Sequence, residues 1–370
     1  MFAGRTPGGG SAAHDPSPSV ENANGGEGLF VASNEAPAVP SRNPGMKIGV
    51  IPPVPMEPFV ASHHEVVNLW SAFFLEQDRV SWMDTAHLAG FPENYSPWAM
   101  GLYGLVCERG IEAVFYPETG VPREVVNVLH LLEEQEIRLV PFSFPLLRNQ
   151  QRLREELDKL CKRLDVDQGV LETVMETWQQ VRTVLRRFDG LQQRTGAFSS
   201  RDYSAMLARS MDPRGDLEGL RREIERGILD YRDLNRERWI RLGILGLTPY
   251  RGGFYGLLEQ AKAVVIYDEW GVENNPMSAS TDLSVLYHQC SLPYGLKRRL
   301  ERTQREAATR RLHGVILGVE YLSDCLRDEG FFKANLGLPV HTVENRGGEL
   351  LSPPEEKGLL RFLDQLGRKA

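Results

Sequence analysis

Short apolar runs alternate with longer amphipathic segments from residue 46 to about residue 146. The short runs predict strands at residues 47–51, 79–84, 113–116 and 138–141. The segments between them carry apolar residues at spacings of three and four, and predict helices at residues 58–76, 98–109 and 124–135. Such alternation is typical of βαβ units with a mostly parallel sheet. We therefore expect a first α/β domain over residues 46–146.

A helical pattern without strands follows over residues 147–236. Large apolar residues recur every three or four positions, as at Leu153, Leu157 and Leu160. Asp and Gly interrupt the pattern near residues 165–169 and 189–190, where we expect helices to end. This segment is predicted to be a helical connector.

Strand–helix alternation resumes over residues 237–370, which we expect to form a second α/β domain. The predicted strands are residues 241–247, 263–267, 314–319 and 340–344. The predicted helices are a short one ending near residue 261 and longer ones at residues 296–311, 321–335 and 354–366. The expected fold class is therefore α/β, with two Rossmann-like or flavodoxin-like parallel-sheet domains joined by a helical segment.

Residues 1–45 are rich in Gly, Pro, Ser, Ala and Asn and show no apolar periodicity, so they predict a disordered tail. Met46 directly precedes the first predicted strand. The sequence leaves open whether these 45 residues are native or come from an upstream start.

Charge and composition narrow the classes of partner. Lys and Arg number 43 against 50 Asp and Glu, a net charge of −7, which argues against a nucleic-acid or anionic-membrane partner. The longest apolar runs are strand-length, so no membrane helix is expected. Four scattered cysteines without a CxxC pair favour a cytoplasmic, reducing location.

A glycine-rich turn at residues 246–253 (GLTPYRGG) joins a predicted strand to a predicted helix. Loops at the carboxyl ends of parallel strands commonly bind ligands, so Thr248, Tyr250 and Gly252 are candidate substrate-binding residues. The spacing matches neither a P-loop nor a GxGxxG motif. An ordinary strand–helix loop explains the same residues.

Two adjacent carboxylates, Asp268 and Glu269, end the predicted strand 263–267. They are candidates for acid–base catalysis or cation binding. Acidic residues also end strands simply because they need water, so both interpretations stay open.

Aromatic and basic residues lie together at residues 287–299. Tyr287, Tyr294 and Arg299 would suit a coenzyme A tail, with the arginine as a phosphate partner. A helix start with packed tyrosines accounts for them equally well. No His or Cys spacing typical of a zinc site is present, so we expect no metal site of that kind.

Several short motifs follow one another in order across residues 46–370. They are residues 54–58 (VPMEP), 92–101, 112–117 (EAVFYP), 242–246 (LGILG), 257–269 (LLEQAKAVVIYDE), 291–295 (SLPYG), 311–316 (RLHGVI) and 338–344. No single motif is specific. Their order and spacing resemble the 2-hydroxyacyl-CoA dehydratases (the D-component of the 2-hydroxyglutaryl-CoA enzyme) and the subunits of benzoyl-CoA reductase.

The resemblance implies two α/β domains, pairing as a heterodimer and three cysteines per subunit around a [4Fe–4S] cluster. It also implies an ATP-hydrolysing activator that injects one electron, so that a ketyl radical forms on the acyl-CoA and expels hydroxide. Such low-potential reduction requires a cluster, since no side chain supplies it.

This chain departs from the family at all three cysteines. The position of the first family cysteine corresponds to Tyr95 or Ser96, that of the second to residues 118–120 and that of the third to Ser323, and none of these residues is a cysteine. Cys325 is offset from the third position by two residues, which rotates a helical side chain by roughly 200°, so it is a candidate metal ligand only in a shifted register. One thiolate does not hold a cubane.

Three functions follow as hypotheses. The first is a cluster-deficient dehydratase-like subunit, a structural or acyl-CoA-binding partner of a homologous cluster-bearing subunit and its ATP-dependent activator. The second is an active iron–sulfur dehydratase or reductase subunit with unusual ligation, in which case it is a lyase. The third is a two-lobed ligand-binding protein without a redox role.

Overall fold

The computed structural model describes residues 45–76, 79–230, 236, 238–320, 326–346 and 350–368, with the side chains of 326 and 327 excepted. All but the last residue of the predicted tail therefore lies outside the described residues, as do Ser323 and Cys325.

Four parallel strands form the first sheet, in the order β2-β1-β3-β4. They are β1 (Lys47–Val50), β2 (Glu65–Asn68), β3 (Ala113–Pro117) and β4 (Arg138–Phe142). Val50 pairs with Asn68 on one side and with Phe115 on the other. Ile48, Val50 and Phe115 are fully buried, as expected for a parallel sheet with helices on both faces.

The second sheet repeats this arrangement with the order β6-β5-β7-β8, again all parallel. Its strands are β5 (Ile240–Gly246), β6 (Ala263–Asp268), β7 (Gly314–Glu320) and β8 (Val340–Asn345). In both sheets the second strand lies on one side of the first and the later strands on the other. The strand order therefore reverses between β1 and β3, and again between β5 and β7. The predicted α/β fold class with two parallel sheets is confirmed.

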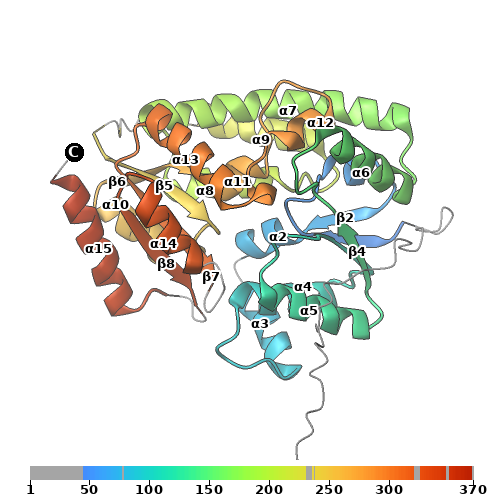
Figure 1. Cartoon of the computed structure of the whole chain (residues 1–370), viewed down its shortest axis with the longest axis horizontal. Coiled ribbons are helices and arrows are strands. Elements are labelled where there is room, and N and C mark those ends of the chain that lie inside the picture. Colours follow the sequence, from blue (N-terminus) through green and yellow to red (C-terminus); the bar gives the residue numbers. More distant parts are fainter. Residues whose placement is uncertain are drawn as a thin grey trace, which may run out of the picture. The chain divides into compact units, whose positions relative to one another are not determined.

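Four helices of the first half share one core on one face of its sheet (Figure 1), namely α2 (Leu69–Leu75), α3 (Arg79–Leu88), α4 (Pro97–Glu108) and α5 (Arg123–Glu134). The short helix α1 (Glu57–Val60) contributes to the core on the opposite face. The remaining helices of the second half are α10 (Phe254–Gln260), α11 (Glu269–Glu273), α12 (Leu283–His288), α13 (Leu296–Arg310), α14 (Leu326–Asn335) and α15 (Pro353–Gly367), with a 3-10 turn at Leu292–Tyr294.

The predicted helical connector covers both sheets rather than standing apart from them. It contains α6 (Gln150–Arg163), α7 (Gln168–Thr195), α8 (Ser200–Ser210) and α9 (Leu217–Leu229). The first turns of α7 place Leu171 and Met175 in the core of the first sheet. Its later turns place Val181 and Leu185 in the core of the second. At 1.5 Å per residue α7 is roughly 42 Å long, and Figure 1 shows it passing α12 and α9.

Three local predictions are wrong. Residues 58–76 form α1, β2 and α2 rather than one helix, because Val66 and Val67 pair with β1 and Asn68 then caps α2 through the Ser71 amide. The expected strand at 79–84 lies within α3.

The helix break expected at residues 189–190 is also absent, whereas the one near 165–169 is present. Asp189 accepts hydrogen bonds from Arg310 and Tyr203, so it faces the protein interior as part of α7 and does not end the helix.

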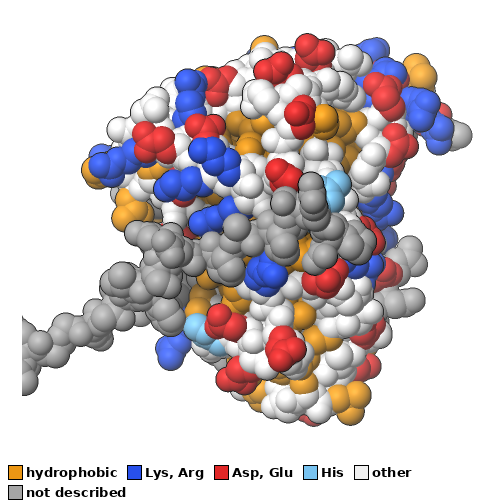
Figure 2. Space-filling model, turned by 90° about the vertical axis from the view of Figure 1, so that its right-hand side faces the viewer, with side chains coloured by type: hydrophobic (Ala, Val, Ile, Leu, Met, Phe, Trp, Pro, Cys, Tyr) orange, Lys and Arg blue, Asp and Glu red, His pale blue; other side chains and the backbone are white. Residues whose placement is uncertain are grey.

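No described helix combines the length and the apolar character needed to cross a membrane. On the face shown in Figure 2, Lys and Arg side chains lie among Asp and Glu side chains.

Candidate functional site

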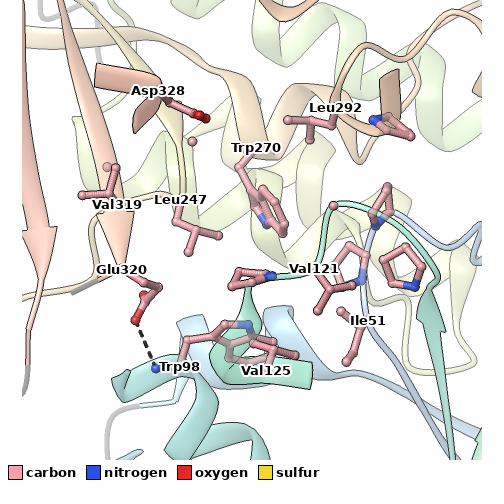
Figure 3. Close-up of a pocket in the computed structure, with 18 of the residues that line it drawn as sticks. Ile51, Trp98, Val121, Val125, Leu247, Trp270, Leu292, Val319, Glu320 and Asp328 are labelled. Atoms are coloured by element: carbon pink, nitrogen blue, oxygen red, sulfur yellow. Dashed lines mark hydrogen bonds between the residues drawn. The ribbon is translucent and has the colours of Figure 1, made fainter. Parts of the chain in front are cut away.

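A cavity of about 140 Å³ lies where the carboxyl ends of the inner strands of both sheets meet. We call it the switch-point cavity. Its walls come from the segments at the ends of β1, β3 and β5 and from the last residues of β7 (Figure 3), namely residues 51–53, 117, 119–122, 246–247 and 317–320. Open parallel sheets bind ligands at the carboxyl ends of strands where the strand order reverses. In this chain the order reversals of both sheets lie at the same cavity.

Most of the cavity wall is apolar. Trp98 from the start of α4 and Trp270 from α11 face the space from opposite sides, with Val121 and Leu247 beside it and Leu292 beyond Trp270 (Figure 3). A small apolar cavity with few polar groups is the usual form of a site for an organic ligand.

Glu320, the last residue of β7, is the most buried carboxyl group of the wall, at 1% exposure. Its Oε2 accepts hydrogen bonds from the Ser96 hydroxyl (2.8 Å) and the Trp98 amide (3.4 Å), both at the amino end of α4. Its Oε1 accepts one from the Tyr250 hydroxyl at 3.0 Å. Glu320 therefore joins the second sheet to α4, as the dashed line in Figure 3 illustrates.

Burial raises the pKa of Glu320 to about 7. The hydrogen bonds from Ser96, Tyr250 and the Trp98 amide lower it, but by less, and the nearby Glu124 raises it further. This carboxyl group consequently changes its charge near neutral pH.

Tyr250, one of the predicted substrate-binding residues, does not line the cavity but donates a hydrogen bond to Glu320. Its ring packs beneath the Arg79 guanidinium, 5.1 Å from the ring centroid, and Arg79 donates to its carbonyl oxygen at 2.5 Å. The hydroxyl has a pKa well above its ordinary value, because the residue is buried next to Glu320. Tyr250 thus remains a neutral donor to Glu320.

Arg299, also predicted, does line the cavity, but its three guanidinium nitrogens are already bound to carboxylates. Nε and Nη2 donate to Glu269 at 3.0 and 2.7 Å, and Nη1 donates to Asp328 at 2.8 Å. Glu269 also accepts from the Gly246 amide at 2.8 Å, which ties this cluster to the end of β5. The pKa of Arg299 is raised by Glu269 and Asp328 despite its burial.

Asp268 and Thr248 bind each other away from the cavity. The Thr248 hydroxyl donates to both Asp268 oxygens at 3.0 and 3.1 Å, and the Gly271 amide donates to Oδ1 at 3.2 Å. Burial raises the pKa of Asp268 to about 6. Asp268 therefore caps α11, and only its neighbour Glu269 reaches the wall, through Arg299.

The other predicted residues lie elsewhere. Gly252 is exposed and bridges to Leu350. Tyr287 donates to Glu57 at 2.9 Å in a buried group with Arg182. Tyr294 packs beneath Arg148. Within residues 287–299, the cavity is lined by Leu292, Pro293 and Arg299.

Sequence reasoning missed Glu320, Trp98 and Trp270. Glu320 ends an apolar strand just as Asp268 does, so the same signal was present in the sequence. The difference is that β7 is an inner strand next to the order reversal, whereas β6 is an edge strand.

Of the positions near which the resemblance places cluster cysteines, Gly120 is part of the cavity wall and Ser96 hydrogen-bonds to the wall residue Glu320. The described wall residues include no thiol, and carboxylates with a paired arginine do not fit the thiolate set of a cubane. Cys107, Cys161 and Cys290 are free thiols that lie outside the wall.

No protein-family model matches this sequence, and no curated protein matches it.

Proposed function

We propose that this chain binds a coenzyme A thioester, with the acyl group in the switch-point cavity. The observation that carries the proposal is the position of this apolar cavity at the carboxyl ends of β1, β3, β5 and β7, where two order reversals meet. The family resemblance supplies the thioester, and the cavity supplies a place for its acyl end.

The size of the cavity supports a short acyl group. A cavity of roughly 150 Å³ lined by apolar side chains holds one benzene molecule. At about 140 Å³, the switch-point cavity suits an acyl group of similar bulk. Coenzyme A is far larger, so in this proposal its pantetheine and nucleotide lie outside the cavity.

The proposal extends to the role of the chain in an assembly. We propose a dehydratase-like subunit that holds no cluster of its own and pairs in the cytoplasm with a homologous, cluster-bearing subunit and an ATP-dependent activator. The absence of a thiol from the described wall and the replacement of family cysteines by Ser96 and Gly120 favour this role over an active iron–sulfur subunit. The free thiols Cys107, Cys161 and Cys290 are in keeping with a reducing location.

Isothermal titration of the full chain with butyryl-CoA tests acyl-CoA binding. Val121→Trp adds bulk to the cavity wall, so we expect it to weaken binding by about tenfold or more, since overpacking costs about 1–3 kcal/mol. Leu147→Trp is the matched control, because Leu147 is 86% exposed and lies outside the wall, and its affinity should equal that of the unaltered chain.

Equal affinity of the Val121→Trp and Leu147→Trp variants would show that the acyl group binds elsewhere. If no coenzyme A ester binds while a small polar molecule does, the chain is instead a two-lobed ligand-binding protein of another class.

A further inference from the structure

We infer that the switch-point cavity selects uncharged acyl groups and rejects acyl groups that carry a second carboxylate, with Glu320 and Asp328 as the residues that determine this choice. The inference rests on the proposed binding of a coenzyme A thioester and names the class of acyl group that binds.

The charges of the cavity wall favour this selection. Glu320 and Asp328 each present a carboxyl group, and among the described wall residues Arg299 is the single cation. Arg299 is bound by Glu269 and Asp328, so one positive charge faces two negative charges before any ligand enters.

An acidic acyl group would therefore enter the cavity without a free cation to pair with. Burying an unpaired carboxylate in an apolar space is costly, and carboxylates a few ångströms away add repulsion. Glu124 adds further negative charge close to Glu320.

Two helix amino ends act in the opposite direction. Helix α4 begins at the cavity and already donates to Glu320, and helix α5 begins there with the N-cap residue Pro122, which provides no side-chain hydrogen bond. Each helix amino end carries roughly half a positive charge, so the two together offset about one ionised carboxylate. With Arg299 they stand against the three carboxyl groups of Glu269, Glu320 and Asp328, and the balance at the cavity remains negative.

The protonation of Glu320 makes the selection depend on pH. Its pKa is raised to about 7, and the groups that face it are the Ser96 hydroxyl, the Trp98 amide, Tyr250 and Glu124. Below this pKa a neutral carboxyl group can donate a hydrogen bond to a ligand oxygen. Above it the carboxylate repels an anion, so discrimination against an acidic acyl group should grow as the pH rises.

Titration with butyryl-CoA and succinyl-CoA at pH 6 and pH 8 tests the inference. The two acyl chains have equal length and differ by the terminal carboxylate, so effects on the shared coenzyme A moiety cancel in the ratio of dissociation constants. We expect butyryl-CoA to bind about 30-fold more tightly at pH 8, and the ratio to fall several-fold at pH 6.

Two variants assign the effect to residues. Glu320→Gln keeps a neutral amide in place, so the ratio should stay at its pH 6 value at both pH values. Asp328→Asn removes one of the two carboxylates on Arg299, so succinyl-CoA should bind several-fold more tightly. Glu301→Gln is the control, because Glu301 is a partly exposed residue of α13 that pairs with Arg298 and lies outside the wall, and it should leave the ratio unchanged.

The outcomes separate this inference from the proposed function. If succinyl-CoA binds as tightly as butyryl-CoA at both pH values, the selection is wrong while coenzyme A binding stands. If the pH dependence persists in Glu320→Gln, or if Asp328→Asn leaves succinyl-CoA binding unchanged, those residues do not determine the choice. If neither ester binds, the inference and the proposed function both fail.

Discussion

At the scale of single residues, the important feature is the carboxyl group of Glu320, which lies in an apolar wall and accepts hydrogen bonds from the start of α4 and from the segment after β5. Three hydrogen bonds reach Glu320 from Ser96, Trp98 and Tyr250, and they offset only part of the desolvation that its burial imposes. Such a group makes the folded state sensitive to pH, because its charged form is more costly when folded than when unfolded.

The stability of the chain should therefore fall as Glu320 ionises. Its pKa is about 7 in the folded state against an ordinary value of 4.5, so the folded state binds the proton more tightly. The stabilising effect is fully present below about pH 4.5 and is lost as the pH rises through about 7, at a cost on the order of 3 kcal/mol. Glu320→Gln should lack this component of the pH dependence.

Urea denaturation of the unaltered chain and of Glu320→Gln between pH 4.5 and 8 measures this difference. Asp268, with a pKa raised to about 6, adds a similar loss at lower pH that both proteins share. Parallel curves of unfolding free energy against pH would show that Glu320 ionises at its ordinary value.

At the scale of secondary-structure elements, α7 decides how the two sheets are covered. Its sequence contains Asp189 and Gly190, which predict a break, yet the helix continues to Thr195. Asp189 is 8% exposed and accepts from both Arg310 terminal nitrogens at 2.8 Å and from Tyr203 at 2.6 Å. This buried pair joins α7 to α13, and its partners are far away in the sequence.

Removing this carboxylate should destabilise the chain strongly. In Asp189→Ala the Arg310 guanidinium stays buried and keeps only Glu306 and the Ile266 carbonyl as acceptors. Breaking such a buried pair costs about 3 kcal/mol or more. Asp364→Ala in α15 is the control, because Asp364 pairs with Arg368 on the surface and should change the unfolding free energy by less than about 0.5 kcal/mol. Chemical denaturation of the two variants makes the comparison, and equal effects would contradict it.

The sequence predicts elements whose pattern is local and misses those that depend on partners far away in the chain. Strands such as β3 and β7 are short apolar runs between helices, so their pattern was sufficient. Strand β2 was missed because Val66 and Val67 run directly into the apolar helix α2, and only pairing with β1 separates the two.

The candidate site was harder to predict than the fold because its residues depend on strand order. An acidic residue ends both β6 and β7, but only β7 adjoins the reversal of strand order, and its Glu320 reaches the cavity. Arg299, predicted from the sequence to bind substrate, does line the cavity, although its pairing with Glu269 and Asp328 could not be read from the sequence.

At the scale of the whole molecule, the two sheets share one topology and open onto one cavity. The same order, with the second strand on one side and the later strands on the other, places β1 and β3 opposite β5 and β7 around the switch-point cavity. At one side of this cavity, Glu320 and its donors Ser96 and Tyr250 form a hydrogen-bond network.

The composition of this region predicts the iron content of the isolated chain. A cubane takes several thiolates, and the described wall offers carboxyl groups and a paired arginine instead. After anaerobic purification and reconstitution with iron and sulfide, we expect fewer than about one iron per chain, against about four for a bound cluster. Cys325→Ala should have the same iron and acid-labile sulfide content as the unaltered chain. About four irons in the unaltered chain, lost in Cys325→Ala, would instead make Cys325 a ligand and the chain an iron–sulfur subunit with unusual ligation.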